Sequence, residues 1–137
     1  MASTIRSGRR SDVDSVLLLW SQSGAEPTHT DDSESLVRLL ANDPDALILA
    51  EDGAELVGSV IAAWDGWRGS VYRLVVAPSH RRQGLASRLL ARAEAHLASV
   101  GAVRLQAIAV ESDPAAVGFW GATGWERQVE RLRFVNG

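Results

Sequence analysis

The sequence predicts a mixed α/β fold in one domain, residues 1–137, built on a central twisted mixed sheet of about six strands with helices on both faces. Short apolar runs alternate with stretches whose apolar residues recur at helical spacing. A long stretch of this second kind, 84–100, separates the strand candidates 70–76 and 104–110, and such a crossover joins parallel strands. Earlier strand candidates are separated by short turns and are expected to pair antiparallel.

Two amphipathic helices are expected before the central strands. Ser11, with Asp14 three residues later, is typical of a capped helix start, and apolar residues then recur at i, i+3, i+4 and i+7. Asp32 or Ser33 caps the second helix. Strands are expected at 5–6, 46–50, 56–64 and 70–76.

The second half of the chain predicts the longest helix, 84–100, followed by a strand, a short helix and a last strand. The inward stripe of the long helix comprises Leu85, Leu89, Ala93, Leu97 and Val100. The later elements are expected at 104–110, 115–123 and 125–135. The last of these has a weak strand pattern and an unpaired edge, so a homodimer paired through it is possible.

Composition excludes several classes of function. The chain has no cysteine, which excludes disulfides, thiolate zinc sites and a cysteine nucleophile. All 14 basic residues are arginine, which excludes lysine Schiff-base chemistry. A net charge of −3 argues against a nucleic-acid partner.

Two further expectations follow from what the sequence lacks. No apolar run is long enough to span a bilayer and the first residues do not resemble a signal peptide, so we expect a cytoplasmic protein with no membrane partner. The three histidines, His29, His80 and His96, are scattered; we expect them to be solvent-exposed and to hold no metal.

The turn between strand 70–76 and helix 84–100 has the chemistry of a phosphate site. A helix N-terminus offers unpaired N–H groups and a partial positive charge. Gly84 and Ala86 leave the backbone open to a ligand, and Arg81 and Arg82 add cationic donors. The segment lacks the lysine of a Walker loop and the glycines of a Rossmann fingerprint. The alternative is an ordinary basic, solvated turn.

Two motifs in this order resemble the GNAT superfamily of acyl-CoA-dependent N-acyltransferases. The first is Arg81-x-x-Gly84-x-Ala86 after a strand ending in Val-x-Pro. The second runs from Asp113 to Trp125 and is similar to the family's Asn-x-x-Ala-x-x-Phe-Tyr-x-x-x-Gly-Phe, with Asp for Asn and Trp120 for Tyr. One helix and one strand separate the motifs, as in the family.

The resemblance implies a fold in which the fourth and fifth strands splay apart to admit acetyl-CoA. It implies direct acetyl transfer to an amine in a ternary complex, with the Val76 N–H as donor to the thioester oxygen. The cofactor-binding residues that it implies are Leu74, Val75, Val76, Arg81, Arg82, Gln83, Gly84, Leu85, Ala86, Ser87, Asp113, Ala116, Phe119 and Trp120.

The positions at which relatives carry proton-handling groups depart from the family pattern. They are Trp120, Ser70 and Ile108, none of which titrates usefully. We expect Tyr72 to substitute as the acid or as a water anchor, and Glu111 as the base. The alternatives are a half-buried strand aromatic for Tyr72 and a solvated loop charge for Glu111.

The acceptor side of the site is expected to be acidic. Residues 11–37 contain six carboxylates, Glu26 among them, and no arginine before Arg38. A cationic small amine or peptide amine would suit this charge, although most of these acids also lie at helix starts. Trp64 and Trp67 flank a turn and could line the acceptor pocket.

The alternative function is an acyl-CoA-binding sensor or scaffold that has lost catalysis; a phosphate-ligand protein unrelated to CoA is a third reading.

Overall fold

The computed structural model describes residues 3–137. Contacts between residues divide the chain into two units, one that ends at Gln106 and one from Ala107 to Gly137. In chain order the helices and strands are β1 (Thr4–Ser7), α1 (Val13–Gln22), α2 (Ser33–Asn42), β2 (Leu47–Asp52), β3 (Glu55–Trp64), β4 (Gly69–Val76), α3 (Leu85–Ser99), β5 (Leu105–Ala107) and α4 (Pro114–Ala122). Two short 3-10 helices, η1 (Arg10–Asp12) and η2 (Pro78–His80), precede α1 and α3.

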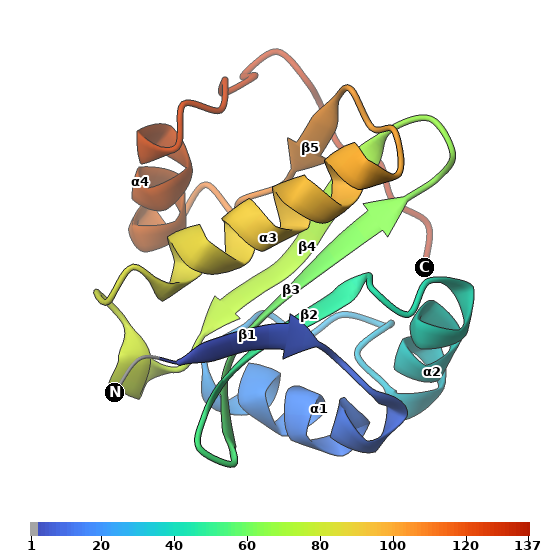
Figure 1. Cartoon of the computed structure of the whole chain (residues 1–137). Helices are drawn as coiled ribbons and strands as arrows, with labels where there is room; N and C mark the ends of the chain where they lie inside the picture. The colour runs from blue at the N-terminus through green and yellow to red at the C-terminus, as the bar shows by residue number, and fades with distance from the viewer. Residues whose placement is uncertain (1–2) are drawn as a thin grey trace. The chain divides into compact units, whose positions relative to one another are not determined.

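The sheet has five strands in the order β1-β2-β3-β4-β5. The first four pair antiparallel in sequence order. Helix α3 then crosses back so that β5 runs in the same direction as β4 (Figure 1). The predicted mixed sheet, with hairpins followed by one crossover, is therefore confirmed.

The sixth strand predicted at 125–135 is wrong, because the segment has irregular backbone throughout. Its apolar residues Val129, Leu132 and Phe134 are exposed. Charged residues would lie on both faces of a strand there, so neither face would be apolar enough to bury. The homodimer that was expected to form through this strand stays a prediction.

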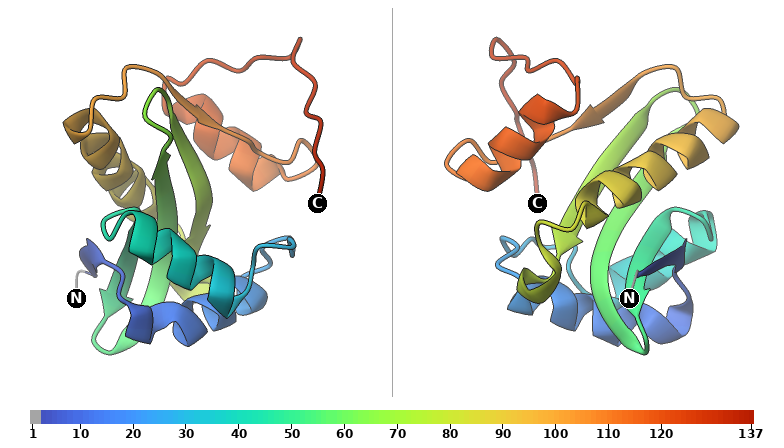
Figure 2. Two further views of the ribbon diagram at one scale, coloured as in Figure 1. Left: turned by 90° about the vertical axis from the view of Figure 1, so that its right-hand side faces the viewer. Right: turned by 60° about the vertical axis from the view of Figure 1, so that its left-hand side comes forward.

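Helices cover both faces of the sheet, as predicted (Figure 2). On one face α1 and α2 pack against β2 and β3 in a buried cluster comprising Val13, Val16, Leu19, Trp20, Leu36, Leu47, Leu49 and Ile61. On the other face the stripe of α3 is buried, except for Val100, which is exposed. Gly58 and Gly69 permit this close approach, since a Cβ at Gly58 would lie 2.9 Å from Leu89 Cδ1 and one at Gly69 would lie 2.9 Å from Leu97 Cδ1.

The predicted cap of the first helix is also wrong. The single turn η1 precedes α1, and the carboxylate that accepts from the entering backbone is that of Asp12, at 2.8 Å from the Arg9 nitrogen. Asp12 is also hydrogen-bonded by Arg6 of β1, which ties this helix start to the sheet. For α2, Asp32 is the cap, and it accepts from the Ser35 N–H at 2.7 Å. Within residues 3–137, no helix is long and apolar enough to cross a membrane.

Candidate functional site

The turn before α3 presents an open backbone. Gly84 has φ +76°, the left-handed conformation that glycine adopts without strain. The backbone hydrogen bond from Arg88 N–H to Gly84 O starts the helix, so the N–H groups of its first turn point beyond the helix end. Nothing lies within 4 Å of where a Gly84 Cβ would be. This geometry suits an anion such as a pyrophosphate.

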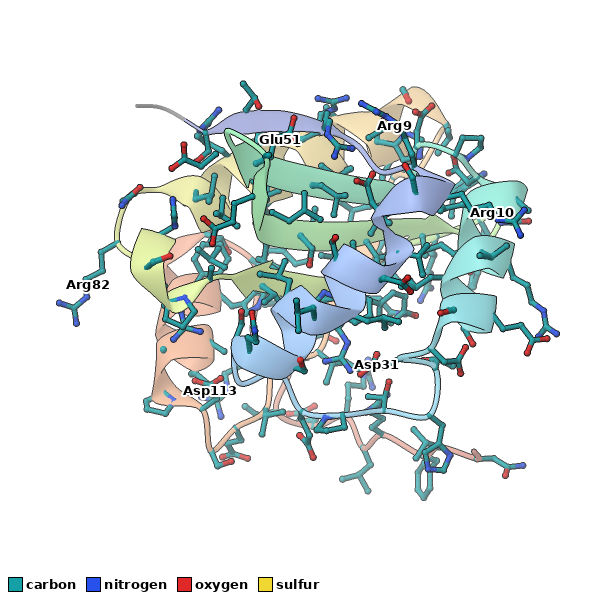
Figure 3. All side chains as sticks on the ribbon, turned by 90° about the horizontal axis from the view of Figure 1, so that it is seen from below. Arg9, Arg10, Asp31, Glu51, Arg82 and Asp113 are labelled. Carbon is teal, nitrogen blue, oxygen red and sulfur yellow. The ribbon has the colours of Figure 1, made fainter. Side chains whose placement is uncertain are left out.

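The arginines around this turn divide into two groups. Arg81 donates from Nε to the Val76 carbonyl at 3.1 Å and from Nη2 to the Ser23 carbonyl at 2.8 Å, and it thereby joins the end of β4 to the end of α1. Arg88 donates to the Ser3 carbonyl at 2.9 Å. The side chain of Arg82 instead extends away from the fold (Figure 3). Arg82 therefore offers an exposed cation at the turn, while Arg81 shapes it.

Two histidines that were expected to be exposed are paired with carboxylates. His80 Nε2 lies 2.9 Å from Asp52 Oδ2, and His96 Nε2 lies 2.8 Å from Asp43 Oδ2, both with largely buried rings. The first pair holds η2 against the β2–β3 turn, and the second holds α3 to the end of α2. Among residues 3–137 no three potential metal ligands gather.

Strand β4 leaves one edge open beside this turn. The contacts of β5 with β4 lie at its start, where Gly69 N–H donates to Arg104 O at 3.0 Å and the Gln106 amide donates to Ser70 at 3.1 Å. The strand β5 ends at Ala107, three residues earlier than predicted. Within the first unit, Leu74–Val76 pairs with β3 on one edge only.

The Val76 N–H points to this open edge. Ala77 N–H donates to Val57 O of β3, and successive N–H groups of a strand point to opposite edges. Within the first unit the N–H of Val76 therefore points away from β3, and its role as donor to the thioester oxygen stays a prediction.

A β-bulge interrupts β4 at Arg73. Ser59 of β3 faces Val75 and Ile61 faces Tyr72, so one residue of β3 lies opposite two residues of β4. Arg73 has φ +51°, which is strained for a residue with a side chain and costs about 1–3 kcal/mol. The bulge turns the strand. Beyond it, each side chain of β4 points to the opposite face of the sheet from the one that regular alternation would give.

Arg73 is the residue of this site that the sequence reasoning missed. Its guanidinium forms a paired contact with Asp31 and donates to the Glu26 carbonyl at 2.8 Å. Its carbonyl accepts from the buried hydroxyl of Ser59, which in turn accepts from the Trp20 indole at 2.9 Å. A charged residue beside the apolar run Leu74–Val76 is the signal that indicates such a site, because a strand facing a core tolerates a charge only with a partner.

The structure places the predicted catalytic and acceptor residues of the first unit on different surfaces. Tyr72 pairs with Ile61 and so lies on the α1–α2 face, 50% exposed. Trp64 pairs with Gly69, whose Cβ position faces α3, so Trp64 lies on the opposite face of the sheet. Trp67 lies at the β3–β4 hairpin tip, 69% exposed, with Arg68 stacked on its ring at 4.1 Å. Trp64 is thus not brought together with Tyr72.

Most acids of the α1–α2 region already have partners. Asp12 pairs with Arg6, Asp31 with Arg73 and Glu34 with Arg38. Hydrogen bonds from Arg6 lower the pKa of Asp12, and the cap bond from the Ser35 N–H lowers the pKa of Asp32. The side chains of Asp14 and Glu26 are exposed. Half of the six carboxylates expected on this side are therefore paired with arginines.

In the second unit, the carboxylate of Asp113 caps α4 and accepts from the Ala116 N–H at 3.2 Å. Phe119 and Trp120 meet edge to face with ring centroids 5.4 Å apart, and Trp120 also lies 4.8 Å from the ring of Trp125.

Two other residues that the sequence analysis singled out also lie in the second unit. Glu111, the predicted base, is exposed and lies 3.5 Å from Arg127. Ile108, one of the departures from the family pattern, is exposed as well.

Comparisons with known proteins agree with this geometry. The profile of the acetyltransferase (GNAT) family matches residues 14–125. An acetyltransferase of Pectobacterium atrosepticum is 34% identical over 116 residues, which is 85% of this chain and 82% of the relative. An acetyltransferase of Yersinia enterocolitica is 34% identical over 124 residues, 90% of this chain and 88% of the relative.

Solved structures show the same fold. The PaiA N-acetyltransferase of Thermoplasma acidophilum, in complex with coenzyme A, has a TM-score of 0.82 at 14% identity over 93% of this chain and 92% of that one. An aminoglycoside 6′-N-acetyltransferase of Acinetobacter haemolyticus has a TM-score of 0.78 at 16% identity, covering 98% of each chain. The chain belongs to the GNAT family of acetyltransferases, because the family profile matches across both motifs and an acetyltransferase is 34% identical over 85% of the chain.

Proposed function

We infer that this acetyltransferase transfers an acetyl group from acetyl-CoA to a primary amine of a small molecule or peptide, by direct attack in a ternary complex. The observation that carries the proposal is the open N-terminal turn of α3, where Gly84 is left-handed and nothing lies within 4 Å of its Cβ position. A diphosphate is the part of acetyl-CoA that such a turn accepts.

Two features of the first unit suit acetyl-CoA. The N–H groups of the first turn of α3 and the exposed cation of Arg82 suit the diphosphate. The open edge of Leu74–Val76 suits the amide groups of the pantetheine arm, which can add to it as a strand would. Asp113, Ala116, Phe119 and Trp120 of the second motif complete the set that the family resemblance assigns to the cofactor.

The chemistry asks little of the protein beyond positioning and proton transfer. Acetyl-CoA supplies a thioester, at whose carbonyl carbon the neutral amine forms a C–N bond while the C–S bond breaks. The Val76 N–H, directed to the open edge of β4, polarises the carbonyl oxygen. The amine loses one proton and the thiolate gains one, so two proton-handling groups or waters are needed.

Tyr72 is our candidate for the proton that the thiolate gains, either directly or through a water. It lies one residue before the bulge, half-exposed on the α1–α2 face. Trp120 can donate a hydrogen bond to the sulfur but cannot deliver a proton, because indole has no accessible acid pKa. Glu111, exposed in the second unit, is the candidate base.

The two ends of α3 allow a matched test of cofactor binding. Gly84 at the start and Gly101 just beyond the end both have positive φ, and both have open space at the Cβ position. Gly84→Glu and Gly101→Glu therefore introduce the same charge, each at a backbone position with positive φ. We expect calorimetric titration with coenzyme A to show binding to the wild type and to Gly101→Glu, and none to Gly84→Glu. Equal affinity for the two variants would contradict the proposal.

Turnover separates the enzyme from a binding module. The wild type is incubated with acetyl-CoA and a panel of amines, and thiol release is measured. We expect release with at least one amine. Tight coenzyme A binding without release across the panel would instead favour the sensor or scaffold, a reading that rests on Trp120 in place of the family's tyrosine.

A further inference from the structure

The loop between α1 and α2 is held to β4 by a single side chain. Residues 24–32 form no helix or strand of their own. Arg73 reaches this loop from the bulge in β4: Nε donates to Asp31 Oδ1 at 3.1 Å, and Nη2 contacts Asp31 Oδ2 and the Glu26 carbonyl. Asp31 also accepts from the Thr28 N–H at 3.0 Å, so the contact closes the loop on itself.

The same residue is fixed at its backbone. Its left-handed φ is sparsely populated for arginine and persists only if the surroundings hold it. Ser59 Oγ donates to the Arg73 carbonyl at 2.8 Å, and Trp20 Nε1 donates to Ser59 Oγ at 2.9 Å. The guanidinium carbon lies 5.2 Å from the centroid of the Trp20 ring. Strand β3, helix α1 and the loop thus all meet at Arg73.

The contact is shielded from solvent. The Arg73 and Asp31 side chains are 15% and 18% exposed, so their attraction is screened less than that of a surface pair. A matched surface pair exists on α2, where Arg38 and Glu34 are 76% and 77% exposed. Such exposed pairs contribute little.

We propose that Arg73 is a positioning residue that holds the loop 24–32 in the place where it forms a wall of the amine site. This rests on the proposed function. The bulge lies between Tyr72 and the open edge of β4, so a loop anchored there borders the point of acetyl transfer. Arg73 contacts neither reactant; it acts through the loop.

The test uses Arg73→Met, which keeps the length of the side chain, with Arg73→Lys as the conservative variant and Asp31→Asn as the partner variant. Arg38→Met is the matched control. Hydrogen exchange is measured over residues 24–32 and over α3. Spermidine and tyramine serve as amine probes, and coenzyme A affinity is measured by calorimetry.

For Arg73→Met and Asp31→Asn we expect exchange in 24–32 to become at least tenfold faster, with α3 unchanged. The KM for the amine that turns over is expected to rise about tenfold, while kcat falls less and coenzyme A affinity stays within twofold. Arg73→Lys is expected to raise the amine KM less than Arg73→Met does. Arg38→Met is expected to leave loop exchange, the amine KM and coenzyme A affinity unchanged. The double variant of Arg73 and Asp31 is expected to raise the amine KM by no more than either single variant does.

Unchanged exchange in 24–32, or an unchanged amine KM, overturns this inference alone. A loss of coenzyme A affinity in Arg73→Met that is as large as the rise in the amine KM also overturns it, because Arg73 would then support the whole fold. A wild type that binds coenzyme A but acetylates no amine overturns the proposed function, and this inference with it, even if the loop proves to be anchored.

Discussion

Tyr72 is the chain's one tyrosine, and the structure leaves it half-exposed on the α1–α2 face, next to the bulge of β4. Removing a general acid slows a reaction by about 10²–10⁴-fold. We therefore predict that Tyr72→Phe lowers kcat about 100-fold and leaves coenzyme A affinity within twofold. Steady-state kinetics with the best amine of the panel, together with calorimetry, checks this. An unchanged kcat would remove Tyr72 from the mechanism and leave proton transfer to water.

Asp12 gives a prediction about acid stability. Its carboxylate is 14% exposed and accepts two hydrogen bonds from Arg6 at 2.8 and 2.9 Å. These bonds lower its pKa, so the stabilisation is fully present above the ordinary pKa of an aspartate and is lost as the pH falls through the lowered value. We predict that Asp12→Asn destabilises the fold by about 1–3 kcal/mol at pH 7, and that the difference from wild type shrinks below about pH 4.

Urea unfolding between pH 3 and pH 7 measures this difference. Glu34→Gln is the control, since it breaks an exposed Glu–Arg pair within α2 and should cost no more than about 0.5 kcal/mol. If the difference in free energy of unfolding between wild type and Asp12→Asn grew as the pH fell, the ionised carboxylate of Asp12 would not be the stabilising form.

At the scale of the elements, α1, β3 and β4 are joined by a buried hydrogen-bond chain. Ser59 is fully buried and lies between the Trp20 indole and the Arg73 carbonyl. Ser59→Ala would leave one buried donor and one acceptor without this partner, at about 1–3 kcal/mol each. We predict a loss of about 2–4 kcal/mol in the free energy of unfolding, measured in urea. The exposed Ser21→Ala of α1 should change it by less than about 0.5 kcal/mol.

The elements also show how far sequence patterns reach. Both N-terminal helices, the hairpin strands and α3 were predicted, because their periodicity is strong and their ends carry caps or turn residues. The strand at 125–135 was not there, and β5 is shorter than expected. Neither segment has a clear alternation, so its conformation depends on what it packs against rather than on its own residues.

At the scale of the whole molecule, the six acids of residues 11–37 suggested a cationic acceptor amine. The structure reduces that expectation, because Asp12, Asp31 and Glu34 are neutralised by arginines. Exposed charges such as Glu26 contribute about 0.2–1 kcal/mol to a pair interaction.

We therefore predict that spermidine is preferred over carboxylate-bearing amines of similar size by no more than about fivefold in kcat/KM. The preference should fall in Glu26→Gln and in higher salt, because an exposed charge is screened. Competition assays with the two amine classes measure it. A preference of 100-fold or more would require a buried acidic group in the acceptor site instead of Glu26.

By itself, the sequence determined the family and most of the secondary structure, and it predicted the cofactor turn, since each depends on residues close together in the chain. Helix caps, the Arg81-x-x-Gly84 spacing and apolar periodicity are local properties. The tertiary structure alone decided which charges remain free and which face each strand residue occupies. Arg73 meets a carboxylate 42 positions away, and Arg81 meets a carbonyl 58 positions away. The bulge in β4 moves the residues after it to the other face, which no local pattern reveals, because the register depends on the neighbouring strand.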